Sequence, residues 1–221
     1  MNPGTLYIVS TPIGNLEDIT LRAIRILKEV DLIAAEDTRR ARILLEAYNM
    51  KNTLTSYHSY NLEKKTPQLI NAMREGKNIA LISDSGTPGI SDPGSVLISE
   101  SIKSNIPLTV IPGPTAFVAA LVLSGKPTNK FIFEGFLSNK RERRRNQLRE
   151  LKDARKTVIV YESPHRIVKF LQDFIDIIGD QEIVLAREIT KQFEEIKRKK
   201  PSQHLKDFAK NKPRGEFVVI F

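Results

Sequence analysis

The chain has 221 residues and a net charge of +9; 40% of its residues are apolar, none is cysteine and three are histidine. This composition is typical of a globular protein with one large or two smaller domains; it excludes disulfides, thiolate metal sites and a cysteine nucleophile, and three scattered histidines predict no metal site. No apolar run approaches the ~20 residues of a membrane-spanning helix, and the first ten residues lack the features of a secretory signal, so we expect a cytoplasmic protein.

Strands and helices alternate along the first 125 residues. Short apolar runs bounded by turn residues predict buried strands at residues 6–9, 32–35, 79–82 and 108–111. Helical spacing of apolar residues, with capping or breaking residues at the ends, predicts helices after Thr20, over residues 38–47, from Thr66 to Gly76, and over residues 96–102 and 114–123. This order is typical of a parallel sheet covered by helices.

The alternation pauses at Gly125 and resumes after Asn129, so residues 1–125 and 126–221 are predicted to form an N-terminal and a C-terminal domain. In the second domain we expect strands at residues 131–133, 158–161, 183–186 and 217–221, and helices at residues 140–153 and 164–178. The basic run at residues 197–200 is interpreted as a short low-complexity tract. The predicted fold class is α/β, with two α/β domains and mainly parallel sheets.

Ligands of open α/β sheets bind beyond the carboxyl ends of the strands, so the loops that follow predicted strands are candidate sites. Two of these loops differ in how strongly they indicate a site. The loop at residues 10–18 lacks a G-x-G-x-x-G fingerprint, so a structural turn is the simpler interpretation. The loop at residues 83–94 holds three Gly, two Pro and two Asp but no Lys, which excludes a Walker A loop. Its glycines allow a ligand to approach closely and its carboxylates can accept hydrogen bonds, so we prefer a functional role to a plain long turn.

A third loop, Pro-Gly-Pro-Thr-Ala at residues 112–116, opens a predicted helix. The first backbone amides of that helix and the Thr115 hydroxyl can contact a ligand, or the segment can simply start the helix.

Together these loops carry a resemblance to a known family. The strings STPIGNLEDIT, EDTRR, SDSGTPGISDPG, IPGPTA, FEGFL, YESPHRI and AREITK are similar to those of the tetrapyrrole methylase superfamily, over nearly the whole chain. Within it they resemble the ribosomal RNA small-subunit methyltransferase branch, which methylates the ribose 2′-hydroxyl of a cytidine in 16S ribosomal RNA. The resemblance implies two α/β domains with S-adenosylmethionine (AdoMet) in the cleft between them, a homodimer, and the small ribosomal subunit as partner.

By match of motif, the resemblance also implies where AdoMet binds. Residues 84–90 are expected to line the cofactor, with Asp84 as the best single candidate, and Pro12 is expected at the substrate side. The implied cofactor-binding set is Pro12, Asp84, Gly86, Thr87, Pro88, Gly89, Ile90, Thr115, Ala116, Leu137, Glu162 and Arg187.

Two departures from the family pattern bear on the function. The glycine-rich first loop of many porphyrin-modifying members is replaced here by residues 12–18, which favours the RNA branch. Many members of that branch continue into a further small domain, whereas this chain stops at Phe221; either a short natural member or a truncated chain is expected.

A ribose hydroxyl is a weak nucleophile, so a general base is expected beside the methyl donor. The candidates are Glu36 and Asp37, which follow the second strand, and Glu188, which follows a strand of the second domain. An ion pair or helix cap with Arg39 and Arg40 is an equal alternative for the first two, and Arg39 can instead bind a backbone phosphate.

The charge is unevenly distributed. Residues 1–125 hold 12 basic and 12 acidic residues, whereas residues 126–221 hold 23 basic and 14 acidic ones, which is typical of a polyanion-binding half. Nine of the basic residues lie at 140–156, in and around a predicted helix. A solvated helix face is the alternative to a stripe of phosphate contacts. The predicted RNA contacts on one face of this helix are Arg141, Arg144, Arg145 and Arg149.

Two other functions are considered. A C-methyltransferase acting on a tetrapyrrole (a precorrin or porphyrinoid) is the rival enzyme, although the few carboxylates of such a substrate do not require so basic a half. An RNA-binding protein without catalysis is the non-enzyme alternative, and the glycine-rich loop at residues 83–94 argues against it.

Overall fold

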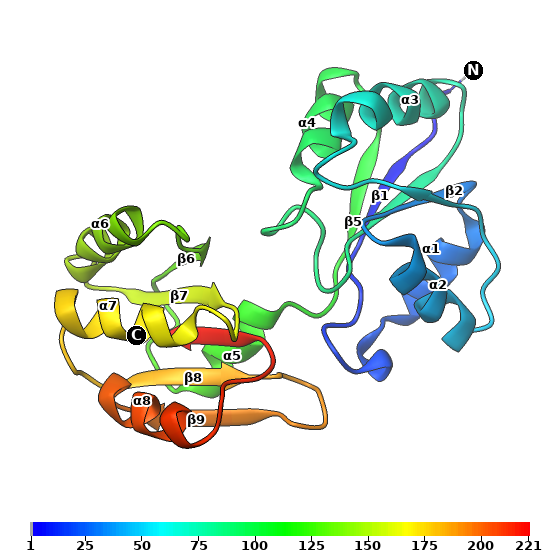
Figure 1. The fold of residues 1–221 in the computed structure, drawn as a ribbon. Helices are drawn as coiled ribbons and strands as arrows, with labels where there is room; N and C mark the ends of the chain where they lie inside the picture. Colours follow the sequence, from blue (N-terminus) through cyan, green and yellow to red (C-terminus); the bar gives the residue numbers. More distant parts are fainter. Residues whose placement is uncertain (1) are drawn as a thin grey trace. The chain divides into compact units, whose positions relative to one another are not determined.

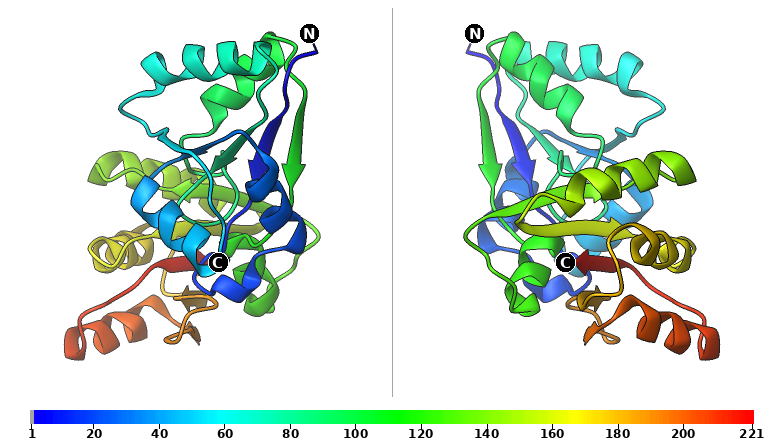
Figure 2. Two further views of the ribbon diagram at one scale, coloured as in Figure 1. Left: turned by 90° about the vertical axis from the view of Figure 1, so that its right-hand side faces the viewer. Right: turned by 90° about the vertical axis from the view of Figure 1, so that its left-hand side faces the viewer.

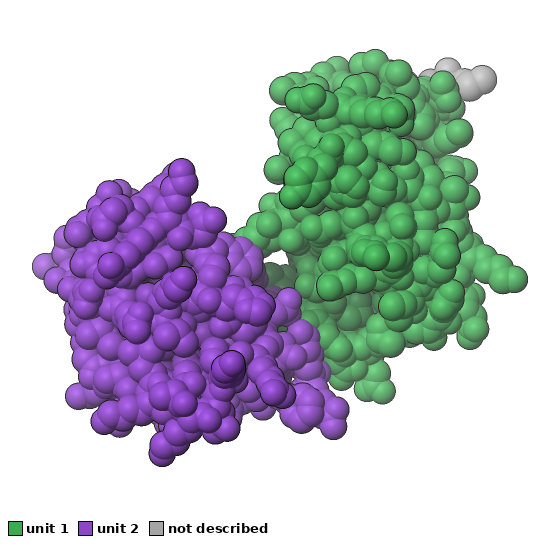
Figure 3. All heavy atoms as spheres, in the orientation of Figure 1, with its two compact units in different colours: residues 1–115 green, residues 116–221 purple. Residues whose placement is uncertain are grey.

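The computed structural model describes residues 2–221, and the chain forms two compact units, Met1–Thr115 and Ala116–Phe221 (Figure 3). This division differs from the expected boundary after residue 125 by one helix, α5 (Ala116–Ser124). The helix packs against strands of the second unit, and its residues Ala120 and Leu121 are buried. No helix of the described part of the chain is long and apolar enough to cross a membrane.

The first unit is a sheet with helices on both faces (Figure 1). Its strands are β1 (Leu6–Val9), β2 (Leu32–Ala35), β3 (Leu54–Ser56), β4 (Ile79–Ile82) and β5 (Leu108–Ile111). The strand order is β3-β2-β4-β1-β5 and every pairing is parallel, as predicted for this half. The helices are the 3-10 helix η1 (Leu16–Asp18), α1 (Leu21–Glu29), α2 (Thr38–Ala47), α3 (Leu62–Arg74) and α4 (Ser95–Lys103).

Alternation along the strands buries both faces of this sheet. Leu6 and Ile8 pack on the face covered by α3 and α4, whereas Val9 packs on the face covered by α1 and α2. Figures 1 and 2 show the two pairs of helices on opposite faces. Full burial of one such side chain contributes roughly 1.5–3 kcal/mol, and a slip of one residue would exchange the two faces, so the strand register is strongly specified.

Local signals set most of the helix ends. The Thr20 hydroxyl accepts a hydrogen bond from the Ala23 N–H at 3.0 Å and caps α1, as expected. Gly76 follows α3 with a φ of +95°, which glycine adopts without strain. The expected start of α3 at Thr66 is wrong, because the helix already begins at Leu62 and Thr66 lies buried within it.

The second unit also has helices on both faces of a sheet. Its strands are β6 (Phe131–Phe136), β7 (Thr157–Glu162), β8 (Ile183–Arg187), β9 (Glu195–Lys199) and β10 (Phe217–Ile220), in the order β6-β7-β10-β8-β9. Its further helices are α6 (Arg141–Lys152), α7 (Ile167–Ile177) and α8 (Pro201–Lys210). These three share one apolar core with the sheet, and α5 packs against β7, β8 and β10.

The expectation of a mainly parallel sheet is wrong for the second unit. β6 and β7 pair in parallel, but β10 is antiparallel to both of its neighbours, and β9 is antiparallel to β8. β9 returns from β8 without an intervening helix, which antiparallel pairing permits and parallel pairing does not. The basic run at residues 197–200, interpreted as low complexity, lies mostly in β9, a charged edge strand whose sequence carries little apolar signal.

A buried ion pair joins α6 to α7. Arg144 is 4% exposed and Asp173 is 2% exposed, and Arg144 Nη2 lies 2.5 Å from Asp173 Oδ2. Arg141 and Arg145 donate to the other carboxylate oxygen at 3.2 and 3.1 Å. Burial raises the pKa of Asp173, but hydrogen bonds from the three arginines outweigh it and hold that pKa below its ordinary value. Asp173 is therefore ionised, and its carboxylate binds three arginines from the first half of α6.

Asp173→Ala is expected to lower the free energy of unfolding by about 3–5 kcal/mol, because it leaves buried Arg144 without its counter-charge. Urea unfolding followed by circular dichroism measures the loss. The matched control is Asp176→Ala: Asp176 lies 2.7 Å from Arg145, but its side chain is 49% exposed, and exposed pairs contribute about 1 kcal/mol or less. Equal losses in the two variants would contradict this role of Asp173.

Candidate functional site

Parallel pairing brings the loops after β1, β4 and β5 to one edge of the first sheet. β1 lies between β4 and β5, so the segments that follow these strands leave side by side. Thr11 and Gly86 exchange two backbone hydrogen bonds of 2.9 and 3.0 Å, which join the first loop to the glycine-rich loop at residues 83–94. The loops singled out in the sequence therefore meet, at the edge where ligands of such sheets bind.

A chain of hydroxyl groups connects the three loops. Ser10 Oγ lies 2.9 Å from Thr87 Oγ1, and Thr87 Oγ1 lies 3.1 Å from Thr115 Oγ1. Each residue follows a different strand, so the chain runs across β1, β4 and β5. The structure thus brings together the predicted residues Thr87 and Thr115, and it adds Ser10, which the sequence analysis did not select.

The glycine-rich loop folds tightly on itself and on its neighbours. Gly86 and Gly89 have φ values of +79° and +86°, which other residues adopt only with strain. A Cβ atom on Gly94 would lie 2.8 Å from the backbone nitrogen of Gly89, and one on Gly113 would lie 2.8 Å from Ser10 Cβ. These close approaches explain why glycine occupies positions on both loops.

Asp84 is held by the end of β2 and the start of α2. Its Oδ1 accepts a hydrogen bond from the Asp37 N–H at 3.0 Å, and its Oδ2 lies 3.4 Å from Arg40 Nη1. Its own N–H donates to Glu36 Oε2 at 3.4 Å. The carboxylate therefore has a fixed orientation while its side chain remains 27% exposed at the sheet edge.

The three candidate bases lie in different environments. Burial raises the pKa of Glu36, which favours proton acceptance nearer neutral pH. Hydrogen bonds from Arg39 hold the pKa of Asp37 well below its ordinary value. Burial raises the pKa of Glu188, but hydrogen bonds from the Glu216 N–H and from Lys191 outweigh it and lower that pKa. Of the three, the surroundings of Glu36 are best suited to a base.

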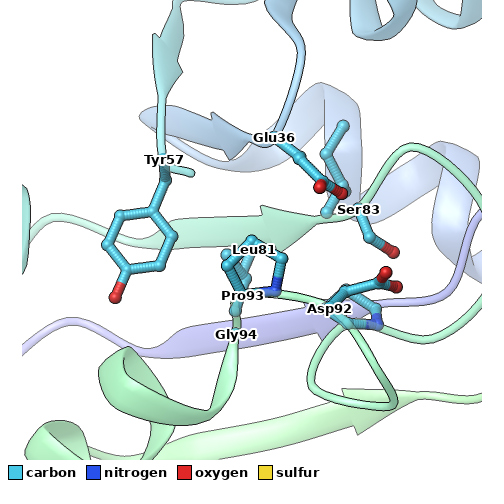
Figure 4. Close-up of a pocket in the computed structure, with 9 residues that line it drawn as sticks. Glu36, Tyr57, Leu81, Ser83, Asp92, Pro93 and Gly94 are labelled. Atoms are coloured by element: carbon cyan, nitrogen blue, oxygen red, sulfur yellow. The ribbon is translucent and has the colours of Figure 1, made fainter. Parts of the chain in front are cut away.

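Asp92, which the sequence analysis did not choose, faces Glu36. Figure 4 shows the side chains of Glu36, Ser83 and Asp92 pointing toward one another. Burial, together with the charge of Glu36, raises the pKa of Asp92 to about 6. The space that they line is too narrow for a water-sized sphere, and within residues 2–221 no three potential ligand side chains gather around a metal position. The two carboxyl groups therefore disfavour each other's charge in a closed space beneath the loop, which is not an open site.

A larger pocket, which Asp84 helps to line, opens on the sheet face covered by α1 and α2. Its volume is about 220 Å³. Leu16 and Ile43 lie at its mouth with 42% and 62% of their surface exposed. The lining residues are Thr11, Pro12, Leu16, Ala35, Asp37, Arg40, Ala41, Ile43, Leu44, Ile82, Ser83 and Asp84.

The predicted cofactor residues of the second unit share one edge of its sheet. Leu137 follows β6, and Glu162 and Arg187 end β7 and β8, which run in the same direction. Glu162 is buried, and its Oε1 accepts a hydrogen bond from the Ser163 N–H at 2.8 Å. Its Oε2 and the Arg187 Nε are buried without a hydrogen-bond partner among the described residues, and burial raises the pKa of Glu162.

The predicted stripe of RNA-binding arginines requires a correction. Arg144 is buried against Asp173, and the Arg145 side chain is only 18% exposed because it pairs with Asp173 and Asp176. Both side chains turn toward α7, so neither is available to a phosphate. Arg141 pairs with Asp173 but keeps 67% of its side chain exposed, Arg149 is exposed, and the Arg39 side chain is 88% exposed beside Asp37.

Asp92→Asn is expected to stabilise the protein above about pH 6 and to leave its stability unchanged below about pH 4. The unfolded carboxyl loses its proton near 3.8 and the folded one near 6, so the wild type loses stability as the pH rises between these values. Thermal unfolding of both proteins across this range measures the difference. A difference that does not depend on pH would contradict the raised pKa.

Comparison with known proteins identifies the family. Residues 5–203 match the Tetrapyrrole (Corrin/Porphyrin) Methylases. A Thermotoga maritima protein named ribosomal RNA small subunit methyltransferase I is 46% identical over 217 residues, which cover 98% of this chain and 97% of that protein. A Bacillus subtilis protein of the same name is 42% identical over 217 residues, covering 98% of this chain and 74% of the relative.

Solved structures agree on the fold. Uroporphyrin-III C-methyltransferase from Thermus thermophilus, complexed with S-adenyl homocysteine, gives a TM-score of 0.67 at 19% identity and covers 98% of this chain and 97% of its own. A diphthine synthase gives a TM-score of 0.77 at 17% identity, with 98% and 89% covered. Identities this low show a shared fold alone. The family match over residues 5–203 and the relatives at 42% and 46% identity carry the assignment. The chain belongs to the tetrapyrrole methylase family, in the branch whose curated relatives are named ribosomal RNA small subunit methyltransferase I.

Proposed function

We propose that this protein uses AdoMet to methylate ribosomal RNA of the small subunit, at the ribose 2′-hydroxyl of a cytidine in 16S ribosomal RNA. The observation that carries the proposal is the convergence of the three predicted loops at the carboxyl edge of the first sheet. It is supported by relatives that are named ribosomal RNA small subunit methyltransferase I and by a structural neighbour complexed with S-adenyl homocysteine. The ribose of a cytidine is the acceptor that the motif resemblance implies.

The residues at this edge fit AdoMet. The positive φ values of Gly86 and Gly89 hold the loop in a tight turn at this edge, with Asp84 at its start. Asp84 and the hydroxyls of Thr87 and Thr115 supply acceptors and donors for ribose and amino groups. We keep Pro12, Pro88 and Ile90 as proposed neighbours of the cofactor in the first unit.

The second unit contributes its own proposed contacts. The Oε2 of Glu162 is buried without a hydrogen-bond partner among the described residues, and a polar ligand can satisfy such an atom. Arg187, whose Nε lies 3.8 Å from Glu195 Oε2, is kept as a proposed contact. Ala116 and Leu137 complete the proposed set.

Bound AdoMet supplies a methyl group on a sulfonium, which is already strongly electrophilic. The chain must then hold the 2′-oxygen in line with that methyl group, and positioning of this kind can account for most of the acceleration. As the oxygen–carbon bond forms and the sulfur–carbon bond breaks, the hydroxyl proton must leave. We keep Glu36, Asp37 and Glu188 as alternative proposed acceptors. Burial raises the pKa of Glu36, but its side chain lines a space closed to water; Asp37 lines the pocket of about 220 Å³, but hydrogen bonds from Arg39 lower its pKa.

RNA affinity is proposed to come from exposed cations. The +9 net charge resides in the second half of the chain, and phosphate contacts of this kind weaken steeply with salt. After the correction for Arg144 and Arg145, Arg39, Arg141 and Arg149 are the proposed phosphate contacts. We further propose a homodimer that acts in the cytoplasm, as the family resemblance implies.

Asp84→Ala is expected to weaken AdoMet binding by about tenfold or more, because it removes a fixed carboxylate from the proposed site. Isothermal titration of AdoMet into the wild type and the variant measures the change. The matched control is Asp31→Ala, which removes a carboxylate at the opposite edge of the same sheet, where it accepts a hydrogen bond from the Asn78 N–H. Unchanged AdoMet binding in Asp84→Ala would contradict the proposed role.

Transfer of a labelled methyl group from AdoMet to purified small ribosomal subunits tests the function itself. After complete alkaline hydrolysis of the RNA, recovery of the label in a dinucleotide would place the methyl group on the ribose, because a methylated 2′-oxygen cannot attack the adjoining phosphodiester. AdoMet binding without transfer to RNA would contradict the proposed substrate, and absence of AdoMet binding would contradict the proposed enzyme class.

A further inference from the structure

The pocket between η1 and α2 adjoins the glycine-rich loop at residues 83–94. It shares Asp84 with the loop, and its residue Thr11 is joined to Gly86 by the two backbone hydrogen bonds. The loop leads into α4 on one face of the sheet, whereas the pocket lies on the face of α1 and α2. Two ligands can therefore reach the same sheet edge from the two faces.

We propose that this pocket receives the target nucleotide of the RNA, unstacked from its neighbours, and presents its ribose to the cofactor loop. The inference rests on the proposed function, and it assigns the acceptor a site within the first unit alone. Enzymes that modify one nucleotide commonly take it out of the stack into a fitted pocket, where apolar side chains flank the base.

The size of the pocket suits a single base. Its volume is about 220 Å³, and a cavity of ~150 Å³ already holds a benzene molecule. A pyrimidine ring with part of its ribose fits this space, whereas a tetrapyrrole macrocycle, which is built of four linked five-membered rings, does not. The volume therefore favours a nucleotide over the rival small-molecule substrate.

The walls of the pocket have the two chemistries that a nucleotide presents. Pro12, Leu16, Ile43 and Leu44 form an apolar side for the faces of the base. Leu16 and Ile43, which are 42% and 62% exposed, are accessible to a base that enters the pocket.

The opposite side of the pocket is polar. Thr11, Asp37, Arg40 and Asp84 offer donors and acceptors for ribose and base edges. Arg39, whose side chain is 88% exposed at the start of α2, lies next in sequence to Arg40 and is available to the adjoining phosphate.

Ile43→Glu tests the pocket, because it puts a charge on the apolar side of the pocket. Ile43 is an exposed position of α2, so the helix is expected to tolerate the change. The matched control is Ile102→Glu on α4, since Ile102 is 60% exposed and lies on the other face of the sheet. Both variants add the same negative charge to the first unit. The measurements are KM and kcat for small ribosomal subunits, the Kd for AdoMet, and thermal unfolding.

The expected result is a rise in KM for the RNA substrate of about tenfold or more in Ile43→Glu, with the Kd for AdoMet and the unfolding temperature close to those of Ile102→Glu. A second variant, Leu16→Glu, is expected to behave in the same way. A KM within about twofold of the control in both pocket variants would overturn the inference, as would an equal loss of AdoMet affinity, which would make the pocket part of the cofactor site. If the wild type binds AdoMet but methylates no RNA, the proposed function fails and the inference falls with it.

Discussion

The site depends on the parallel pairing of β1 with both β4 and β5. Parallel strands deliver their carboxyl ends to the same edge, so three segments separated by dozens of residues meet there, where backbone and hydroxyl hydrogen bonds join them. The strand order also explains why ligands can reach this edge from both faces, because the adjacent strands β2, β4 and β1 are followed by helices on alternate faces of the sheet. The glycine-rich loop, Asp84 and the pocket beside η1 are all consequences of this topology.

Carboxylates and arginines divide into structural and exposed groups, and burial decides between them. Asp173 binds three arginines of α6 and so converts much of an apparent RNA-binding stripe into a packing contact. Asp37, by contrast, pairs with Arg39 at the surface, and Glu36 is half-buried with a raised pKa. Charge counts along the chain therefore overstate the cations that an RNA can reach, although the excess in the second unit remains.

The sequence predicted the first sheet well, because β1, β2, β4 and β5 are local apolar runs whose flanking caps and turns are also local. It predicted the second sheet less well. β9 is an edge strand rich in charge, and the direction of β10 is set by partners that lie far away in the chain. The loops of the site were recognisable from their glycines and carboxylates. The burial of Arg144, the partner of Asp92 and the pocket at Ile43 were not, since each depends on residues brought together only by folding.

The contact between Arg144 and Asp173 has a consequence for handling the protein. At 1 M salt the Debye length is about 3 Å, so the attraction of exposed cations for nucleic acid is largely screened. The Arg144–Asp173 pair, at 2.5 Å and shielded from solvent, is affected far less. Concentrated salt can therefore strip co-purifying nucleic acid from the basic unit during chromatography while the junction of α6 and α7 stays intact.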